Sequence, residues 1–334
     1  DMFDHICSIT FPHYEYITLI WHGGEPLLMG IDFYIQVCNI IDKFKEIYGN
    51  KSVKMIFQTN SLLINHEWIN FFNKHHIHVG TSFDGVCNEL TRGNTQDILN
   101  VFKLMQEESF PVSAISVVTS QTLPHLLEDY HFYKKHKINI KFNPVFKTDL
   151  TQSNEDTLLT SESFIKHMLT FLSTWFYDTN CNIAVEPFID FCLMSINKSK
   201  SCSFSSCLLN WLCVDWMGNI TPCGRNFPEE YNMGNVHDYL NIQEAFYSNG
   251  YLKLLKGSVQ RRAYCKINCP IFDKCHGGCS NDALIYEDIT KPDIFYCKYV
   301  KAMLAQIDSL LENYKSNNIN VNPYVENIFK QVTM

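Results

Sequence analysis

The sequence predicts an α/β protein in which a partial barrel of parallel strands precedes a small cysteine-rich α+β domain. Two observations lead to this prediction. Up to about residue 146, short β-rich runs alternate with longer segments whose apolar residues recur at helical spacing, and such a βαβα rhythm indicates a parallel sheet with helical crossovers. After Ser201 the composition changes, because nine of the 14 cysteines lie between residues 202 and 297. We therefore expect a barrel over 1–146, a helical bridge over 147–200, a cysteine-rich domain over 201–315 and a tail over 316–334.

The first half of the chain contains five predicted strands separated by four predicted helices. The strands are residues 17–23, 53–59, 78–84, 112–119 and 138–146, and the helices are residues 33–49, 66–76, 95–108 and 123–136. Small or polar residues follow the strands, as in HGGEP, QTNS and SFDG, and in a parallel barrel that end of the strands carries the active site. A doubly wound sheet is the alternative, but the chain has no GxGxxG or GxxxxGK[ST] motif.

The composition of the chain limits which partners and which cellular compartment we expect for it. The net charge of −8 comes from 35 acidic and 27 basic residues spread along the chain, so we expect neither nucleic acid nor a membrane surface as a partner. The sequence contains neither an apolar run of membrane-spanning length nor a signal peptide, which predicts a cytoplasmic protein. Because cytosolic thiols stay reduced, regularly spaced cysteines there indicate metal ligation rather than disulfides.

The tetrapeptide Gly23-Gly24-Glu25-Pro26 follows the first predicted strand. Two glycines let a ligand approach bare backbone, and the Glu25 carboxylate suits a cationic group such as an α-ammonium. Pro26 fixes φ where a helix can begin. The simpler alternative is a turn with a helix-capping acid.

The cysteines after Ser201 have a regular spacing. Ten residues separate Cys207 from Gly218, and four separate Gly218 from Cys223. A dense run and one late cysteine follow: Cys265, Cys269, Cys275, Cys279 and Cys297. With Cys202 these make eight thiolates, enough for two 4Fe-4S clusters, and two zinc ions on the same ligands are the rival interpretation.

Taken together, WHGGEP, QTN, SFDG, Arg92 and the cysteine pattern resemble radical S-adenosylmethionine (SAM) enzymes that carry a SPASM domain. The resemblance implies a maturase that uses a 5′-deoxyadenosyl radical from SAM to modify a peptide or protein substrate, with an electron donor such as flavodoxin or ferredoxin. It implies cofactor-binding roles for Gly23, Gly24, Glu25, Pro26, Thr59, Asn60, Ser82, Asp84 and Arg92.

The resemblance also implies a ligand set for each of two auxiliary 4Fe-4S clusters. By similarity to the sulfatase maturases of this family, one cluster takes Cys202, Cys207, Cys223 and Cys279. The other takes Cys265, Cys269, Cys275 and Cys297. Three residues separate Cys265 from Cys269, where the family usually has two. Zinc would not explain the GGEP, QTN and SFDG turns. The thiols outside this region are expected to be small buried hydrophobes: Cys7, Cys38, Cys87, Cys181 and Cys192.

The chain departs from the family pattern at two places. Residues 1–22 contain no C-x3-C-x2-C triplet, so we expect a third, SAM-cleaving cluster on a segment before Asp1 and an N-terminally incomplete chain, and the alternative is a degenerate relative. Gly224 follows Cys223, where sulfatase maturases have an Asp that acts as a base, so no catalytic residue is assigned. We therefore favour a peptide-modifying relative. The alternatives are an anaerobic sulfatase maturase that forms formylglycine and a zinc-stabilised, non-catalytic peptide-binding module.

Overall fold

The computed structural model describes residues 2–145, 155–199, 201–202, 207–225, 227–286, 288–317 and 319–330. The chain divides into two compact units. The first unit comprises Asp1–Phe83, Asn94–Ser113 and Leu208–Lys256, and the second comprises Asp84–Gly93, Ala114–Cys207 and Gly257–Met334. Each unit therefore combines part of the predicted barrel with part of the predicted cysteine-rich domain.

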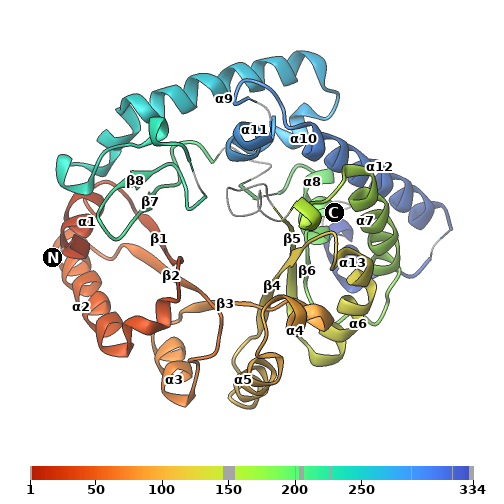
Figure 1. Ribbon diagram of the computed structural model, residues 1–334, viewed down its shortest axis with the longest axis horizontal. Coiled ribbons are helices and arrows are strands. Elements are labelled where there is room, and N and C mark those ends of the chain that lie inside the picture. The colour runs from red at the N-terminus through yellow and green to blue at the C-terminus, as the bar shows by residue number, and fades with distance from the viewer. Residues whose placement is uncertain are drawn as a thin grey trace. The chain divides into compact units, whose positions relative to one another are not determined.

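Three parallel strands form the sheet of the first unit (Figure 1). They are β1 (Tyr16–Trp21), β2 (Ser52–Thr59) and β3 (His78–Ser82), in the order β1-β2-β3. The crossovers are α2 (Ile31–Tyr48) and α3 (His66–Lys74). Trp21 is in register with Phe57, and Phe57 with Val79. The carboxyl ends of these strands consequently lie side by side at one edge.

Aromatic side chains fill the space between this sheet and its helices. Phe57 and Phe72 are fully buried, Tyr34 is nearly so, and the ring centroids of Tyr34 and Phe57 are 4.7 Å apart. On the alternate positions the strands carry polar or exposed residues, such as Lys54, Gln58 and Ser82. One face of the sheet is thus the core, and the other is available to a ligand.

The first unit also contains the N-terminal helix and a segment of the predicted cysteine-rich domain. Helix α1 (Met2–Thr10) is joined to the 3₁₀ helix η6 (Val236–Asp238) by a 3.0 Å hydrogen bond between His5 Nε2 and the Val236 carbonyl. The unit also contains α5 (Thr95–Glu107) and a small antiparallel pair, β7 (Cys213–Val214) and β8 (Ile220–Thr221). Segment 208–256 is therefore anchored on the N-terminal helix.

The second unit has the strand order β4-β5-β6. These strands are β4 (Ser113–Val118), β5 (Asn139–Pro144) and β6 (Val185–Glu186), and β5 is parallel to β6. The helices beside them are α4 (Asn88–Thr91), α6 (Leu126–His136), α7 (Ser161–Phe176) and α8 (Phe188–Ser195). Phe142, Phe171 and Phe188 pack as successive edge-to-face pairs that form the core.

Helices make up the C-terminal part of the second unit. They are α9 (Asn249–Asn268), which belongs to this unit from Gly257 onward, α10 (Phe272–Cys275), α11 (Ser280–Tyr286), α12 (Ile294–Asn317) and α13 (Pro323–Lys330). Tyr299 of α12 packs against Phe164 of α7 and Phe191 of α8. The predicted bridge is therefore part of a helical core.

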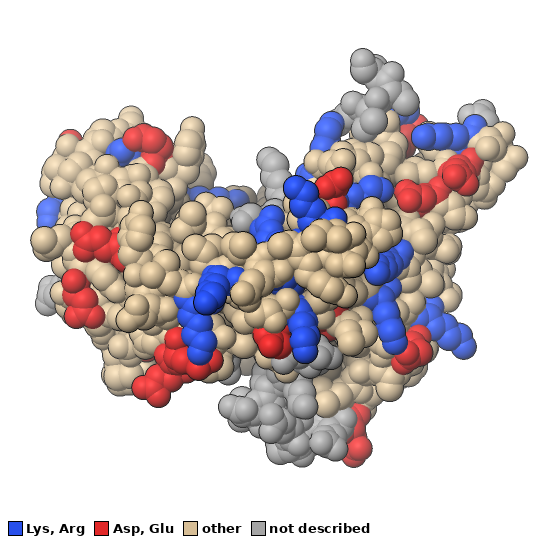
Figure 2. All heavy atoms as spheres, turned by 90° about the horizontal axis from the view of Figure 1, so that it is seen from above, with Lys and Arg blue, Asp and Glu red and all other residues tan. Residues whose placement is uncertain are grey.

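The α/β fold class with parallel strands and helical crossovers is confirmed. Each predicted strand agrees with an observed strand, although residue 146 and most of the polar stretch 147–156 lie outside the described residues. No helix in the described part of the chain is long and apolar enough to cross a membrane. Basic and acidic side chains are both spread over the face shown in Figure 2, as the sequence predicts.

Candidate functional site

The Gly23-Gly24-Glu25-Pro26 turn lies at the carboxyl end of β1. Gly23 and Gly24 have φ angles of 98° and 56°, in the left-handed region that side chains disfavour. No atom lies within 4 Å of a Cβ built on either glycine, so the backbone there faces open space. Pro26 begins the 3₁₀ helix η1 (Pro26–Met29). The turn therefore presents exposed backbone, as expected of a ligand cradle.

The Glu25 carboxylate is held by three hydrogen bonds from the chain itself. Its Oε1 accepts from the Leu27 amide at 3.0 Å and from the Thr59 hydroxyl at 2.7 Å. Its Oε2 accepts from the Asn60 amide at 2.8 Å. A carboxylate has about four acceptor sites, so Glu25 both caps η1 and retains capacity for a further donor. The two sequence-based interpretations, capping acid and ligand site, are compatible.

Thr59 and Asn60 form the turn that meets Glu25. The Thr59 hydroxyl accepts from the Ser61 amide at 3.0 Å while it donates to Glu25, and the Asn60 side chain accepts from the Leu62 amide. Ser61 is fully buried and has a φ of 67°. The structure thus joins the predicted QTN and GGEP turns through one carboxylate.

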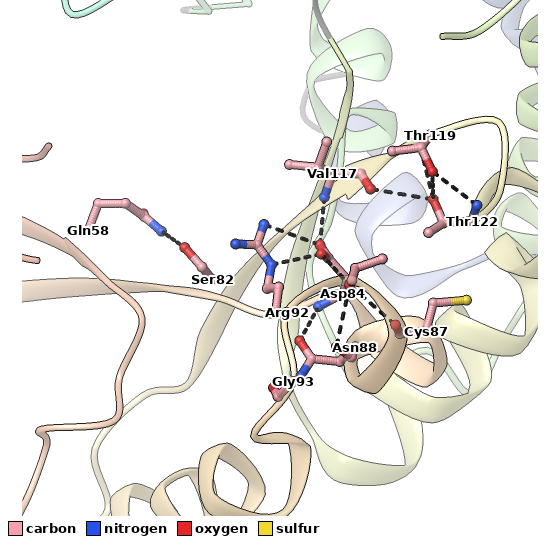
Figure 3. Close-up of polar contacts among 11 residues, drawn as sticks. Gln58, Ser82, Asp84, Cys87, Asn88, Arg92, Gly93, Val117, Thr119 and Thr122 are labelled. Carbon is pink, nitrogen blue, oxygen red and sulfur yellow. Dashed lines mark hydrogen bonds and ion pairs between the residues drawn. The ribbon is translucent and has the colours of Figure 1, made fainter. Parts of the chain in front are cut away.

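Ser82 lies at the end of β3, where it accepts a hydrogen bond of 3.2 Å from Gln58 Nε2 (Figure 3). Gly80 makes this contact possible. Gln58 and Gly80 are register partners, and a Cβ on Gly80 would clash with Gln58 Oε1. The polar face of the first unit therefore carries an ordered pair of polar side chains beside the strand ends.

In the second unit Asp84 is 3% exposed and binds Arg92. Arg92 donates from Nε to Asp84 Oδ2 at 2.7 Å, and its side chain is 32% exposed. The Thr91 hydroxyl donates to Oδ2 at 2.9 Å and the Val117 amide to Oδ1 at 2.8 Å, so these donors converge on one carboxylate (Figure 3). Arg92 is therefore oriented by Asp84 rather than being a freely solvated charge.

Four predicted cluster ligands of the second unit are electrostatic neighbours. Burial raises the pKa of Cys297 to about 12, and the charges of Cys275 and Cys265 contribute to this rise. Burial and then Cys269 raise the pKa of Cys265 and of Cys275. Across the described ranges, no group of three or more His, Cys, Asp or Glu side chains is arranged to hold a metal ion. The thiols are close enough to act on one another electrostatically, but those described do not form a metal-binding arrangement.

The other predicted ligand set is divided between the units. Cys202, Cys207 and Cys279 belong to the second unit and Cys223 to the first. The pKa of Cys207 is raised by burial and by Cys202, while Arg261 and Arg262 lower it. Cys275, Cys279 and Cys297 line one small depression together with Asp282 and Asp293. Thiols from both predicted sets therefore meet in the second unit.

The five cysteines predicted to be buried hydrophobes are confirmed as buried, namely Cys7, Cys38, Cys87, Cys181 and Cys192. Cys213, which had no predicted role, is half-buried on β7, and burial raises its pKa.

Three charged groups in the second unit escaped the sequence analysis. Burial raises the pKa of Asp129 to about 7, and burial with Asp190 raises that of Glu186 to about 7. Arg261 is 1% exposed. Glu186 lies on a two-residue strand and Arg261 on a helix with little amphipathic pattern, so neither had a periodic signal. Apolar neighbours in the sequence were the only available sign for Glu186, and Arg261, which lies between Gln260 and Arg262, had none.

Comparisons with known proteins support one family. A cysteine-type anaerobic sulfatase-maturating enzyme of Clostridium novyi (strain NT) is 27% identical over 282 residues, which are 78% of this chain and 72% of that enzyme. The chain is homologous to the anaerobic sulfatase-maturating enzymes. A serine-type enzyme of Bacteroides thetaiotaomicron is 21% identical over 330 residues, 88% of this chain and 76% of that enzyme. No protein-family model matches the chain.

Two solved structures share the fold of this chain. Native anSMEcpe with bound AdoMet superposes with a TM-score of 0.80 at 21% identity, covering 95% of this chain and 89% of that chain. Streptococcus suis SuiB bound to S-adenosylmethionine gives a TM-score of 0.53 at 15% identity, covering 83% and 64%. The sequence similarity to sulfatase-maturating enzymes, together with this shared fold, agrees with the predicted resemblance to radical SAM enzymes with a SPASM domain.

The comparisons reverse one preference of the sequence analysis. Gly224 led us to favour a peptide-modifying relative, yet the sulfatase-maturating enzymes are the closer match. The preference for another peptide-modifying relative depended on Gly224 alone, whereas the similarity to a sulfatase-maturating enzyme extends over 78% of the chain.

Proposed function

We propose that this protein is a radical SAM enzyme of the sulfatase-maturase type that oxidises a residue of a peptide or protein substrate. The observation that carries the proposal is homology to anaerobic sulfatase-maturating enzymes over 78% of the chain, with the fold of anSMEcpe. The geometry of the Glu25 turn supports it, because exposed backbone and a carboxylate lie together at the strand ends.

The residues of the first unit fit the amino-acid end of SAM. Gly23 and Gly24 leave room against bare backbone, and Glu25, fixed by Thr59 and Asn60, places a negative charge beside them. An α-ammonium group would find a charge-assisted acceptor there. Pro26 sets the turn. Binding roles for Ser82, Asp84 and Arg92 remain predictions.

The thiols of the second unit fit an iron–sulfur group by the chemistry of their donor set. Cys265, Cys269, Cys275 and Cys297 are soft sulfur ligands, and burial followed by the charges of other thiols in this set raises the pKa of Cys265, Cys275 and Cys297. Cys202, Cys207 and Cys279, with Cys223, are proposed as the second set. Such clusters supply electron transfer, and with SAM a third would supply a hydrogen-abstracting radical. The chain's part is to bind and orient these groups.

The substrate we propose is a peptide or an exposed protein segment in the cytoplasm. The structure of native anSMEcpe with bound AdoMet and Kp18Cys peptide superposes on this chain with a TM-score of 0.79. We propose a flavodoxin or ferredoxin as electron donor, since the chemistry needs a low-potential source.

A peptide-modifying reaction other than formylglycine formation is the second candidate, and Gly224 is the observation in its favour. Glycine cannot accept a proton, and among the described residues no side chain other than those of its chain neighbours lies within 4 Å of its Cβ position. A maturase that uses a different proton acceptor, or that forms a different bond in its substrate, would not need a carboxylate at position 224.

The test begins with the purified protein, reconstituted anaerobically with iron and sulfide. Equilibrium dialysis with labelled SAM should show binding that Glu25→Ala abolishes and the exposed control Glu67→Ala retains. Mass spectrometry of a cysteine-containing sulfatase peptide, incubated with SAM, reductant and a form of the protein that includes the SAM-cleaving segment expected before Asp1, should show conversion of the thiol to an aldehyde. A crosslinked or dehydrogenated peptide would favour the second candidate. Absence of SAM binding, with zinc in place of iron, would overturn both.

A further inference from the structure

Arg261 is a buried cation in the half of α9 that belongs to the second unit. It is 1% exposed, among the largest fully buried side chains of the described residues. A guanidinium stays charged in proteins, and a charge removed from water is costly unless a counter-charge or hydrogen bonds compensate it. Its surroundings therefore have to supply that compensation.

Neutral acceptors supply the hydrogen bonds. Arg261 Nε donates to the Gly277 carbonyl at 3.0 Å, and Nη1 donates to the Ile289 carbonyl at 2.6 Å. Nη2 donates to the Ser280 hydroxyl at 2.9 Å and, more weakly, to the Gly278 carbonyl at 3.5 Å. These contacts satisfy donors, but they leave the positive charge unbalanced.

The backbone that Arg261 holds is the segment between two predicted ligands of different sets, Cys275 and Cys279. His276, Gly277 and Gly278 all have left-handed φ angles, of 54°, 86° and 72°. Such a run is unfavourable for His276, and the hydrogen bonds that Arg261 donates to the Gly277 and Gly278 carbonyls hold it in place. Arg261 thus sets the path of the chain that places both thiols.

The groups whose negative charge would stabilise the Arg261 cation are thiols. Burial lowers its pKa, the positive charge of Arg262 lowers it further, and the charges that oppose this are those of Cys279, Cys265 and Cys207. Arg261 and Cys265 are one turn apart on the same face of α9. None of the ion pairs found among the described residues includes Arg261. Its natural counter-charge is thiolate sulfur from both predicted sets.

We infer that Arg261 is a positioning and charge-compensating residue shared by the two iron–sulfur ligand sets, fixing the Cys275–Cys279 segment and stabilising the negative charge of the thiolate-bound groups. The inference rests on the proposed function, since it needs the cysteines to bind as thiolates. Cluster potentials depend on net charge and on nearby hydrogen bonds, so a fixed cation favours the reduced, more negative state.

The experiment compares wild type, Arg261→Lys, Arg261→Met and the control Lys266→Met after anaerobic reconstitution with iron and sulfide. Lys266 lies on the same helix but is exposed, so its loss removes a charge without the contacts. Iron and sulfide per chain are measured first, and then the reduced fraction at fixed potentials by dye-mediated titration.

Arg261→Met should lose iron from at least one ligand set, falling to roughly half of wild type. Any cluster it keeps should show a reduced-to-oxidised ratio about tenfold lower at a given potential, which is about 59 mV for one electron. Arg261→Lys keeps the positive charge but not the several hydrogen-bond donors of the guanidinium. Its iron content and its reduced-to-oxidised ratio should therefore both lie between those of wild type and Arg261→Met. Lys266→Met should match wild type.

Circular dichroism of the metal-free proteins separates a folding defect from a cluster effect. If metal-free Arg261→Met unfolds, Arg261→Lys alone carries the test, and it should then bind less iron than wild type while its reduced-to-oxidised ratio stays within about tenfold of wild type. Iron and potentials equal to wild type in both variants would overturn the inference but leave the proposed function intact. A wild type that binds no iron would overturn the proposed function itself.

Discussion

The Thr59 hydroxyl donates a 2.7 Å hydrogen bond to Oε1 of Glu25 and so ties the carboxyl end of β2 to the turn after β1. The Asn60 amide completes this connection through Oε2. Two turns that are 34 residues apart in sequence are thereby fixed by one carboxylate, whose position no single motif determines.

Thr59→Val tests this connection, because valine keeps the shape and removes the hydroxyl. The substitution leaves the buried Ser61 amide without its acceptor and Glu25 without one donor, so the free energy of unfolding should fall by about 1–2 kcal/mol. Urea denaturation measures the loss. Thr18→Val, at an exposed position of β1, is the control and should change little. Equal stability of the two variants would contradict the role assigned to Thr59.

Asp84→Asn should be strongly destabilising, because it leaves Arg92 beside a buried amide instead of a carboxylate. The expected loss is about 3 kcal/mol in the free energy of unfolding. A double-mutant cycle with Arg92→Met should give a coupling energy of at least about 1 kcal/mol. Additive effects in that cycle would mean that the 2.7 Å contact contributes nothing to stability.

Asp129→Asn should stabilise the protein at high pH. Burial raises the folded-state pKa of Asp129 to about 7 from 3.8, so folding favours the protonated form. The cost of ionisation begins as the pH rises through 3.8 and is complete above about 7. The amide of the variant would avoid this cost, and its oxygen can still accept the 2.8 Å bond from the Val86 amide.

Thermal or urea unfolding at two pH values measures this effect. The stability gained by Asp129→Asn should be about 2 kcal/mol larger at pH 8 than at pH 5. The exposed Asp308→Asn on α12 is the matched control. A gain that does not depend on pH would show that Asp129 ionises normally in the folded protein.

Gly224→Asp should be accepted by the fold, because no described atom beyond its chain neighbours lies within 4 Å of the new Cβ and φ is outside the left-handed region. If the reaction is formylglycine formation, a carboxylate there would supply the base that the predicted resemblance to sulfatase maturases implies. The aldehyde yield should then rise about tenfold or more over wild type. Gly224→Asn, of equal size but without a proton acceptor, should leave the yield unchanged, and a rise in both variants would point to sterics.

Elements with a strong hydrophobic period were predictable from sequence. The predicted strand 53–59 and helix 95–108 agree with β2 and α5 within one residue, because their apolar faces lie on a buried core. Helix α9 was missed since its sequence has little amphipathic pattern and contains two glycines. Strand β6 was missed because two residues carry no period.

The site was predictable as a set of residue types but not as contacts. The motifs gave Glu25, Thr59 and Asn60, yet only the register of β1 and β2 shows that one carboxylate joins both turns. Arg261 could not be predicted, because its partners are mostly backbone carbonyls that have no sequence signature. The grouping of segment 208–256 with the N-terminal helix likewise depends on tertiary packing.

The central claim is that the cysteines of this chain bind two iron–sulfur clusters, and metal analysis tests it most directly. Iron, sulfide and zinc are measured in the anaerobically reconstituted protein and in Cys275→Ala, Cys279→Ala and the buried-thiol control Cys38→Ala. The account predicts about eight irons with matching sulfide in wild type and in Cys38→Ala. Cys275→Ala and Cys279→Ala should each lose about four irons, from different clusters. Two zinc ions and no iron in wild type would contradict it.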